Sequence, residues 1–286
     1  MKLTYREAAA RIEKNCQADG RFEAALIFFK LFGLDSAALM MRRDEDFDSD
    51  ELREAIEKRE GGYPLQYILG EWEFFGLTFE VNESCLCPRP DTETLVEAAI
   101  EFLPENGRFL ELCTGSGCIP VSLCKHRPDA CGVATDLFEK TLATAKRNAE
   151  KNGVADKIDF LLADLFEIED FKKRCAAIPN GGFDAVISNP PYIPTRDIED
   201  LSEEVKHEPL AALDGGDDGL DFYRFIVGEY KSLLSPDGVI LLEIGYDQGE
   251  ALCGIAEING FSCEIKKDFG GNDRVAILRH KNGGTI

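Results

Sequence analysis

The spacing of apolar residues changes twice along the chain and divides it into three parts. Over residues 1–70 apolar positions recur every three or four residues, which is typical of amphipathic helices. Residues 71–82 alternate polar and apolar positions about Gly76, and this pattern predicts a β-hairpin. From residue 88 onward, short apolar runs alternate with helical patterns. We therefore expect a helical domain (1–70), a hairpin linker (71–87) and an α/β domain (88–286).

Helix signals are clearest in the first part. Thr4 and Glu7 form a capping box, Ser49 is placed to cap a later helix, and two more helices are expected between them. Pro64 begins a short helical turn that Gly70 ends. The segment contains no cluster of catalytic residue types. It is either a structural cap or a surface that docks a protein substrate.

Seven strands are expected in the α/β part. Five should be parallel and followed by helices: residues 108–112, 132–135, 158–162, 183–187 and 239–244. Residues 261–267 and 274–279 have no helix between them and should pair antiparallel. The fold class is therefore α/β, with a doubly wound sheet closed by a hairpin. In such a sheet the first and fourth strands flank the point where the strand order reverses, and ligands bind at their carboxyl ends.

The segment Pro88-Arg89-Pro90-Asp91-Thr92-Glu93 leads into the first helix of this part. That helix should run to about Leu103, with Asp91 or Thr92 as its N-cap. Prolines on both sides stiffen the backbone of Arg89. Arg89 is either structural or binds a ligand carboxylate or a substrate carbonyl.

The tetrapeptide Asn189-Pro190-Pro191-Tyr192 follows the fourth strand. The prolines have no backbone N–H and hold the preceding residues extended, so the local carbonyls point outward with few competing donors. The Asn189 side chain adds an acceptor, and the Tyr192 ring can stabilise positive charge on nitrogen. This corner suits a planar NH₂ group. The alternative is a proline-rich strand exit with no chemical role.

The first strand ends in a glycine loop, Glu111-Leu112-Cys113-Thr114-Gly115-Ser116-Gly117. Its glycines let the backbone approach a ligand closely, and the next helix supplies free N–H groups. The loop does not match the dinucleotide pattern, because Pro120 falls three positions beyond Gly117. It also lacks the lysine of a phosphate loop.

Acidic residues follow the second and third strands. Asp136 lies 21 residues after Gly115 and suits a ribose diol, although it could instead cap the next helix. Asp164, with Leu165 and Phe166 behind it, suits an adenine amino group and ring; the alternative is an ordinary loop aspartate. A ribose site without a phosphate cradle, facing a site for an NH₂ nucleophile, indicates S-adenosylmethionine rather than NAD or ATP.

The composition argues against nucleic acid and membranes as binding partners. The net charge of −22 is spread along the chain and would repel a nucleic-acid backbone, and the sequence has no compensating basic patch. No apolar run has the length of a signal or membrane span. We therefore expect a cytoplasmic, monomeric protein that has no direct contact with nucleic acid or membrane.

The ten cysteines do not form a metal or disulfide pattern. None belongs to a CxxC pair, and the three histidines are far apart in the sequence. Cys124 and Cys131 lie in apolar runs, so we expect buried, reduced thiols and no metal site. Cys85 and Cys87 are the closest pair, and a redox or metal role for them is the less favoured alternative.

With these residues in place, the sequence resembles the class I methyltransferases, and among them the release-factor glutamine methyltransferases of the PrmC/HemK family. The resemblance covers nearly the whole chain. It rests on seven segments in order: Pro64-Leu65-Gln66-Tyr67-Ile68, Pro88 to Glu93, Glu111 to Gly117, Ser188 to Ile193, Glu208-Pro209 with Ala212-Leu213, Asp218-Gly219-Leu220, and Asn272-Asp273-Arg274-Val275.

The resemblance implies a seven-stranded methyltransferase sheet with a small N-terminal helical domain joined by a β-hairpin. It implies methyl transfer from S-adenosylmethionine, leaving S-adenosylhomocysteine, to the side-chain nitrogen (N5) of the glutamine in the Gly-Gly-Gln loop of class 1 peptide chain release factors. Cys113 and Leu165 depart from the commoner family form, which has glycine at the first position and can have an aromatic at the second.

The residue arguments and the resemblance together give the candidate site. The cofactor contacts are Cys113, Thr114, Gly115, Ser116, Gly117, Asp136, Leu137, Asp164, Leu165, Phe166 and Asn189. The glutamine contacts are Asn189, Pro190, Pro191, Tyr192 and Arg89, of which Asn189, Pro190 and Tyr192 are assigned to catalysis.

Two other functions remain open at this stage. An adenine N6-methyltransferase acting on DNA or RNA presents the same exocyclic-amine geometry and uses a similar tetrapeptide. A non-catalytic binding protein that keeps the fold is the other, and the intact Asn189 argues against it.

Overall fold

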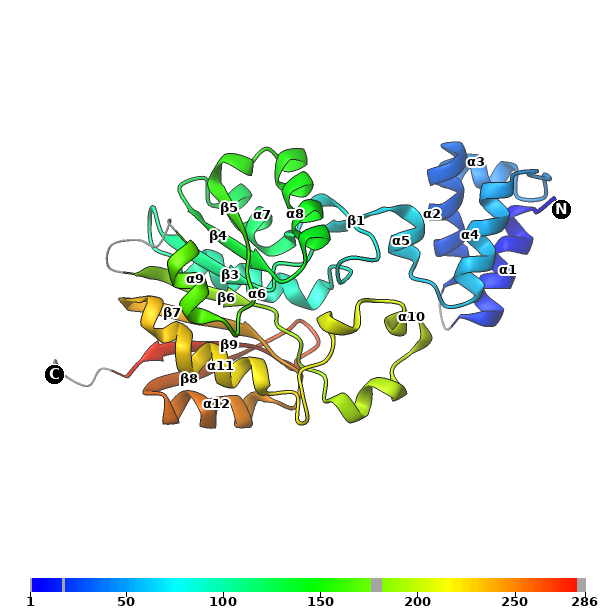
Figure 1. Cartoon of the computed structure of the whole chain (residues 1–286). Helices are drawn as coiled ribbons and strands as arrows, with labels where there is room; N and C mark the ends of the chain where they lie inside the picture. Colours follow the sequence, from blue (N-terminus) through cyan, green and yellow to red (C-terminus); the bar gives the residue numbers. More distant parts are fainter. Residues whose placement is uncertain (1, 17–18, 176–181, 282–286) are drawn as a thin grey trace.

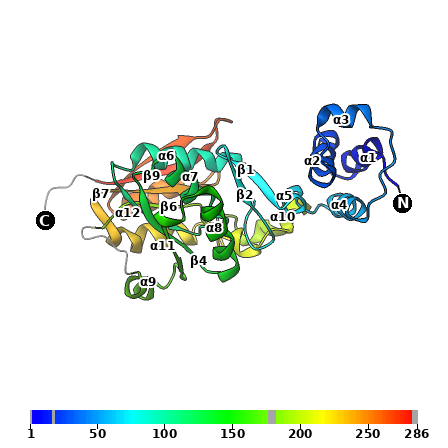
Figure 2. The same cartoon turned by 90° about the horizontal axis from the view of Figure 1, so that it is seen from above.

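The computed structural model describes residues 2–16, 19–175 and 182–281; the outer ends of the first and last expected domains lie outside these ranges. The chain begins with five helices: α1 (Tyr5–Asn15), α2 (Gly20–Phe32), α3 (Ser36–Met41), α4 (Asp50–Glu60) and α5 (Leu65–Leu69). Their apolar faces share one core, in which Phe28 and Ile56 are fully buried. Figures 1 and 2 show α1 to α4 beside the larger α/β part, with α5 leading toward it.

The helix ends follow the local sequence. The Thr4 hydroxyl accepts from the Glu7 N–H while the Glu7 carboxylate accepts from the Thr4 N–H, so the capping box is confirmed. Ser49 caps α4 through the Leu52 N–H. Gly70 ends α5 in the left-handed conformation, with φ 72°.

A buried ion pair joins the helical part to the rest of the chain. The Arg59 guanidinium, at the end of α4, binds the Glu23 carboxylate at 2.6 Å and the Glu204 carboxylate at 3.0 Å. Glu204 belongs to α10 (Glu203–Lys206), far along the sequence. Because the Arg59 side chain is buried, this contact fixes the end of α4 against α10.

A two-stranded hairpin comes next, made of β1 (Glu71–Phe74) and β2 (Leu77–Glu80). The main sheet contains β3 (Arg108–Leu112), β4 (Cys131–Asp136), β5 (Ile158–Leu162), β6 (Phe183–Ser188), β7 (Leu234–Glu243), β8 (Phe261–Lys267) and β9 (Asp273–His280). Its order is β5-β4-β3-β6-β7-β9-β8, with only β9 antiparallel to its neighbours. The doubly wound, seven-stranded fold is confirmed, and β3 lies beside β6 at the reversal point.

Helices cover both faces of this sheet (Figure 1). One layer contains α6 (Glu93–Phe102), α7 (Cys118–His126) and α8 (Glu139–Asn152), and the other contains α9 (Ile168–Arg174), α11 (Asp221–Glu229) and α12 (Gly249–Ile258). Alternate residues of β3 face the two layers: Phe109 belongs to the first core and Leu110 to the second. Short 3₁₀ turns are η1 (Pro90–Thr92), η2 (Ala155–Lys157), η3 (Thr195–Asp200), η4 (Leu210–Ala212) and η5 (Tyr230–Leu233).

One strand boundary differs from the expectation, and one expected helix cap is confirmed. β7 begins at Leu234, not at Val239, because its pairing with β6 shifts register: Phe183 pairs with Leu234 and Ala185 with Val239, so the extra residues, which include Pro236, lie in β7. Thr92 is the N-cap of α6, as expected, although its side chain makes no capping hydrogen bond. The 3₁₀ turn that begins at Pro90 leads directly into α6, and the Thr92 backbone is already helical.

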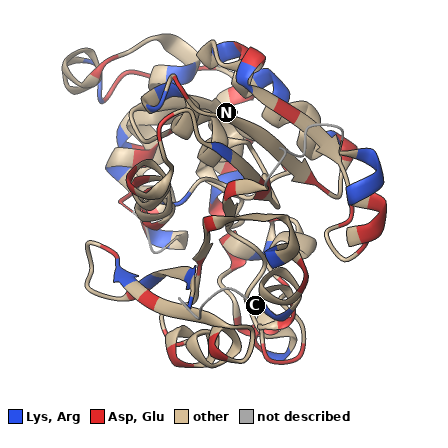
Figure 3. Cartoon of the chain, turned by 90° about the vertical axis from the view of Figure 1, so that its left-hand side faces the viewer, with Lys and Arg blue, Asp and Glu red and all other residues tan. Residues whose placement is uncertain are grey.

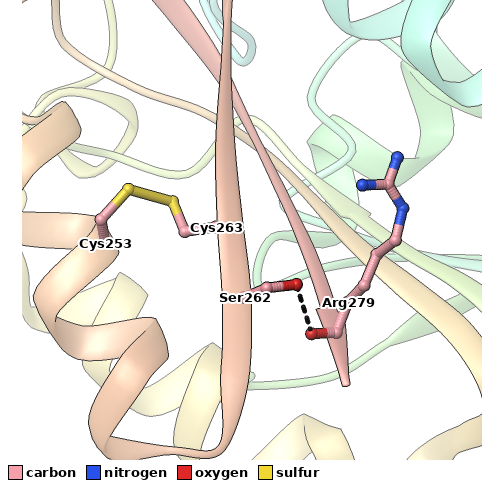
Figure 4. The surroundings of a disulfide bond; sticks show 4 residues. All are labelled: Cys253, Ser262, Cys263 and Arg279. Carbon is pink, nitrogen blue, oxygen red and sulfur yellow. Dashed lines mark hydrogen bonds between the residues drawn. A yellow bond between two sulfur atoms is a disulfide. The ribbon is translucent and has the colours of Figure 1, made fainter. Parts of the chain in front are cut away.

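The expectation that all cysteines are reduced is also wrong. Cys253 in α12 and Cys263 in β8 form a disulfide, shown in Figure 4, with their Cα atoms 5.2 Å apart. The short turn from α12 into β8 brings the two residues together, a proximity that their ten-residue separation does not reveal. The eight other cysteines are reduced, as expected, and five of them are buried.

Three further findings concern charge, membrane-spanning helices and metal ligands. Acidic and basic residues are interspersed in the view of Figure 3. Within residues 2–16, 19–175 and 182–281, no helix combines the length and apolar character needed to cross a membrane, and no three His, Cys, Asp or Glu side chains are grouped to hold a metal ion.

Gly132 of β4 pairs with Phe109 of β3. A β-carbon there would lie 2.3 Å from the Phe109 carbonyl oxygen, so we expect Gly132→Ala to lower the free energy of unfolding by about 2 kcal/mol. Urea denaturation measures this change. Gly254→Ala is the control, because it adds a methyl group to open space inside α12 and should be neutral or stabilising. Equal effects of the two substitutions would contradict the close approach.

Candidate active site

A pocket of about 1090 Å³, including the space at its mouth, opens at the carboxyl ends of β3, β4, β5 and β6. Twelve of the residues assigned from the sequence line it: Arg89, Cys113, Thr114, Gly115, Ser116, Asp136, Leu137, Asp164, Leu165, Phe166, Asn189 and Pro191. Gly117, Pro190 and Tyr192 are not among its lining residues. The structure thus brings most of the predicted cofactor and substrate positions to one pocket.

The glycine loop after β3 contains a run of left-handed residues. Cys113 has φ 59° and Gly115 has φ 56°. This conformation explains why glycine suits position 113, since a side chain there is strained. The Thr114 hydroxyl donates to the buried Glu111 carboxylate, which holds the loop against the strand end. Burial raises the pKa of the Cys113 thiol, so this thiol stays protonated.

Gly117 has a packing role. It precedes α7 with φ 78°, and a β-carbon on it would lie 3.0 Å from the Ala145 β-carbon of α8. Its N–H donates to the Thr114 carbonyl at 2.9 Å. Gly117 therefore shapes the loop by allowing close contact between the two helices.

Asp136 ends β4 with its carboxylate in the pocket. It accepts from the Gly115 N–H at 3.0 Å and from the Phe138 N–H at 3.1 Å, so it ties the glycine loop to the start of α8. Burial raises the pKa of Asp136 and the backbone donors lower it. Each oxygen retains a lone pair for a further donor, which makes the carboxylate able to bind a pair of hydroxyl groups.

Apolar side chains stand exposed around one end of the pocket. Leu137, Phe138 and Phe166 are 52%, 47% and 42% exposed, and all three line it. The Phe166 ring lies 5.0 Å from Phe222, and its backbone N–H donates to Asp164. Exposed apolar groups beside a carboxylate can bind a flat, partly polar ring.

Asn189 lies just beyond β6, where the backbone is held by its neighbour. Ser188 pairs with Leu112 of β3, and its hydroxyl donates to the Leu112 carbonyl at 2.8 Å. The Asn189 side chain lines the pocket, and its amide nitrogen donates to the Thr92 hydroxyl at 3.3 Å.

The rest of the tetrapeptide is held from behind. The Gln248 side chain donates to the Tyr192 carbonyl at 2.9 Å. Gly219 permits this close contact, because a β-carbon on it would lie 2.3 Å from the Tyr192 oxygen. Burial raises the pKa of Tyr192 to about 12, so the phenol is neutral at physiological pH. The roles assigned to Pro190 and Tyr192 stay predictions.

Arg89 lines the pocket, and part of its guanidinium is already hydrogen-bonded within the protein. Its guanidinium donates to the buried Glu208 carboxylate, which also accepts from the Cys87 N–H at 3.0 Å. Burial raises the pKa of Glu208, while Arg89 lowers it. Arg89 is therefore oriented by Glu208 while it remains partly exposed to the pocket.

Sequence reasoning missed several residues at this site. Phe138 and Thr92 line the pocket, and the buried Glu243 carboxyl acts electrostatically on Arg89, Tyr192 and Arg274 around it. Position next to Asp136 was an available signal for Phe138. The sequence indicates only a helix cap for Thr92 and a place within the expected strand 239–244 for Glu243.

Glu243 is an uncommon group for its position. Its side chain ends β7 with 1% exposure, and burial raises its pKa to about 7 although Thr92 and Arg274 lower it. The carboxyl group therefore titrates close to physiological pH.

A mostly parallel seven-stranded sheet with a pocket at its reversal point defines the class I methyltransferase fold. Family models agree: the PrmC N-terminal domain matches residues 4–70 and the methyltransferase small domain matches residues 91–214. The hMettl16 catalytic domain, solved with MAT2A 3′UTR hairpin 1, is 17% identical with a TM-score of 0.58 over 83% of each chain. That likeness shows the fold alone.

Relatives identify the family. The release factor glutamine methyltransferase of Geobacter sulfurreducens is 40% identical over 90% of this chain and 88% of its own. That of Moorella thermoacetica is 37% identical over 95% and 97%, respectively. The chain belongs to the release factor glutamine methyltransferase family, as its sequence motifs predicted.

Glu243 gives a testable pH dependence. A carboxyl group whose pKa is about 7 when folded and 4.5 when unfolded stabilises the protein fully only below pH 4.5, and the contribution is lost as the pH rises to 7. Glu243→Gln removes this loss. We expect the free energy of unfolding of the variant, relative to that of the wild type, to rise by about 2 to 3 kcal/mol from pH 5 to pH 8. Urea denaturation measures both values.

Comparing the free energy of unfolding at two pH values cancels any effect of the substitution that does not depend on pH. Glu250→Gln is the matched control, because Glu250 is exposed at the start of α12. Parallel pH curves for Glu243→Gln and the wild type would disprove the titration.

Proposed function

We propose that this protein transfers a methyl group from S-adenosylmethionine to the side-chain amide nitrogen (N5) of the glutamine in the Gly-Gly-Gln motif of class 1 peptide chain release factors. The observation that carries this proposal is the placement of Asn189 and Asp136 in one pocket. The names of the relatives support a release factor as the substrate.

The pocket fits S-adenosylmethionine by its donor set. Asp136 can accept from the two ribose hydroxyls, and Asp164 can accept from the adenine amino group beside Phe138 and Phe166. Residues 113–116 provide close backbone approach without a phosphate cradle. When bound, the cofactor supplies an electrophilic methyl group on a sulfonium.

The substrate amide is a poor nucleophile, because its nitrogen lone pair is delocalised into the carbonyl. The Asn189 side-chain oxygen and the Pro190 carbonyl accept hydrogen bonds from its two N–H groups. They thereby direct the nitrogen lone pair toward the methyl group. Positioning of this kind can contribute about 7 kcal/mol. The Tyr192 ring stabilises the positive charge that develops on nitrogen, and the proton leaves once the nitrogen is methylated.

Other parts of the chain bind the protein substrate. Arg89, oriented by Glu208, binds a carbonyl of the glutamine loop. Residues 1–70 dock the release factor, and residues 88–286 transfer the methyl group. Residues 71–87 link these two domains. A substrate from the translation machinery implies a cytoplasmic enzyme, and we propose that it acts as a monomer.

Asp136 tests the cofactor site. We expect Asp136→Ala to weaken S-adenosylmethionine binding at least tenfold, because two ribose hydroxyls lose their acceptor. Titration calorimetry measures the affinity. Asp159→Ala, an exposed change on β5, is the control and should bind as the wild type does. Unchanged affinity in Asp136→Ala would remove the ribose assignment.

Asn189 tests the substrate site. We expect Asn189→Ala to lower kcat at least 100-fold while the cofactor Kd stays within about threefold, because Asn189 positions the nucleophile. Labelled methyl transfer to a purified release factor measures kcat. Equal losses of turnover and cofactor affinity would count against this role.

The same assay separates the substrates. A release factor whose Gly-Gly-Gln glutamine is replaced by alanine should accept no label, and neither should duplex DNA. Methylation of DNA alone would replace the proposal with an adenine N6-methyltransferase, which the net charge of −22 disfavours. Transfer to neither substrate would indicate a binding protein.

A further inference from the structure

We propose that Asn148 of α8 is a positioning residue for the cofactor. Its side chain joins the hairpin linker to the glycine loop and fixes the loop in the shape that lines the pocket. The inference rests on the proposed function, because it takes this pocket to be the S-adenosylmethionine site. It makes the linker a supporting part of that site as well as a connection between two domains.

The Asn148 side chain is fully buried, and both N–H groups and the oxygen of its amide are hydrogen-bonded. The oxygen accepts from the N–H of Glu80, the last residue of β2, at 2.7 Å. The amide nitrogen donates to the Glu80 carbonyl at 2.9 Å and to the Ser116 carbonyl at 2.8 Å. One side chain therefore binds both backbone groups of a hairpin residue and one backbone group of the glycine loop.

These backbone partners allow the Asn148 amide a single orientation. An N–H group can only donate and a carbonyl can only accept, so turning the amide over would leave like groups facing each other. Asn148 is 0% exposed, and water does not readily replace a lost hydrogen bond at a site closed to solvent. The amide is therefore held firmly, and so is the Ser116 carbonyl that it binds.

The glycine loop is held at three successive residues. The Thr114 and Gly115 N–H groups donate to β4, at 2.9 Å and 3.0 Å. Asn148 holds the third residue, Ser116, from α8. All three loop residues line the pocket, so a displacement of the Ser116 carbonyl would change the shape of the wall against which the cofactor binds.

A row of polar side chains on α8 binds the linker. Its members recur every three or four residues and so share one face of the helix: Thr141, Thr144, Asn148 and Asn152. The Thr141 hydroxyl donates to the Ser84 carbonyl at 2.6 Å, and the Asn152 amide donates to the Thr78 carbonyl of β2 at 3.2 Å. The row therefore fastens the linker along α8, and the hairpin and α8 lie side by side in Figures 1 and 2.

The linker also forms part of the pocket. Its residues Ser84, Cys85, Leu86 and Cys87 line the pocket together with the glycine loop. Asn148 binds the linker through Glu80 and the loop through Ser116. Two walls of the pocket are thus tied to the same helix by one side chain.

Two substitutions at Asn148 test this contact. Asn148→Asp keeps the shape but has no N–H group for the Ser116 carbonyl, and Asn148→Ala removes the amide. We expect each to weaken S-adenosylmethionine binding at least about tenfold, because the loop loses its fixed shape. Titration calorimetry measures the Kd. With saturating cofactor, kcat should fall less than about threefold, since Asn189 is untouched.

Asn152→Ala is the matched control, because Asn152 lies one turn further along α8 and binds the same hairpin. Its other hydrogen bond, to the Asn148 carbonyl at 2.9 Å, stays within α8. Urea denaturation should show that Asn152→Ala and Asn148→Ala both lower stability, but the Kd of Asn152→Ala should stay within about threefold of the wild-type value. Wild-type affinity in Asn148→Ala, or an equal loss of affinity in Asn152→Ala, would overturn the proposal.

Hydrogen exchange tests the same contact without cofactor or release factor. The hydrogen-bonded N–H groups of Thr114, Gly115 and Gly117 report opening of the glycine loop. We expect them to exchange at least about tenfold faster in Asn148→Ala, and at the wild-type rate in Asn152→Ala. Unchanged exchange in Asn148→Ala would contradict the proposal.

The two measurements keep this inference distinct from the proposed function. A wild-type protein that binds no S-adenosylmethionine would disprove the proposed function, whereas faster exchange in Asn148→Ala would still support the role of Asn148 in positioning the loop. Wild-type exchange and affinity in Asn148→Ala would disprove the inference alone.

Discussion

The site depends on the parallel pairing of β3 with β6 at the reversal point of the sheet. Leu112 lies opposite Ser188, and their side-chain and backbone groups are hydrogen-bonded. Because the two strands end in the same register, the glycine loop and Asn189 leave the sheet side by side. A shift of either strand would separate the proposed methyl donor from its acceptor, so the sheet register sets the reaction geometry.

Buried carboxyl groups near the pocket lower the stability of the fold, but they hold functional groups in position. Glu111 holds the glycine loop, Glu208 orients Arg89, and Glu243 lies behind Thr92. Burial raises the pKa of all three carboxyl groups, which means that their ionised forms are unfavourable in the fold. A core of apolar residues would be more stable but could not direct hydrogen bonds, and direction is what a planar amide substrate requires.

Much of the fold and part of the site could be predicted from local patterns. The strand cores, the capping box of Thr4 and the position of Asn189 follow from spacing and from the chemistry of neighbouring residues. Thr92 and the Cys253–Cys263 disulfide could not, because their partners are distant in sequence or joined by a turn whose geometry only the fold reveals. The start of β7 could not be predicted for a similar reason, since a register shift lets pairing with β6 continue on both sides of Pro236.

One short segment, residues 203–208, contacts both parts of the chain. Glu204 binds Arg59 at the end of α4, and four residues later Glu208 binds Arg89 at the pocket. This segment therefore holds the helical part and the reaction centre at a fixed distance from each other. Under the proposed function, a glutamine is selected by how far it projects from the body of its own protein as well as by the sequence around it.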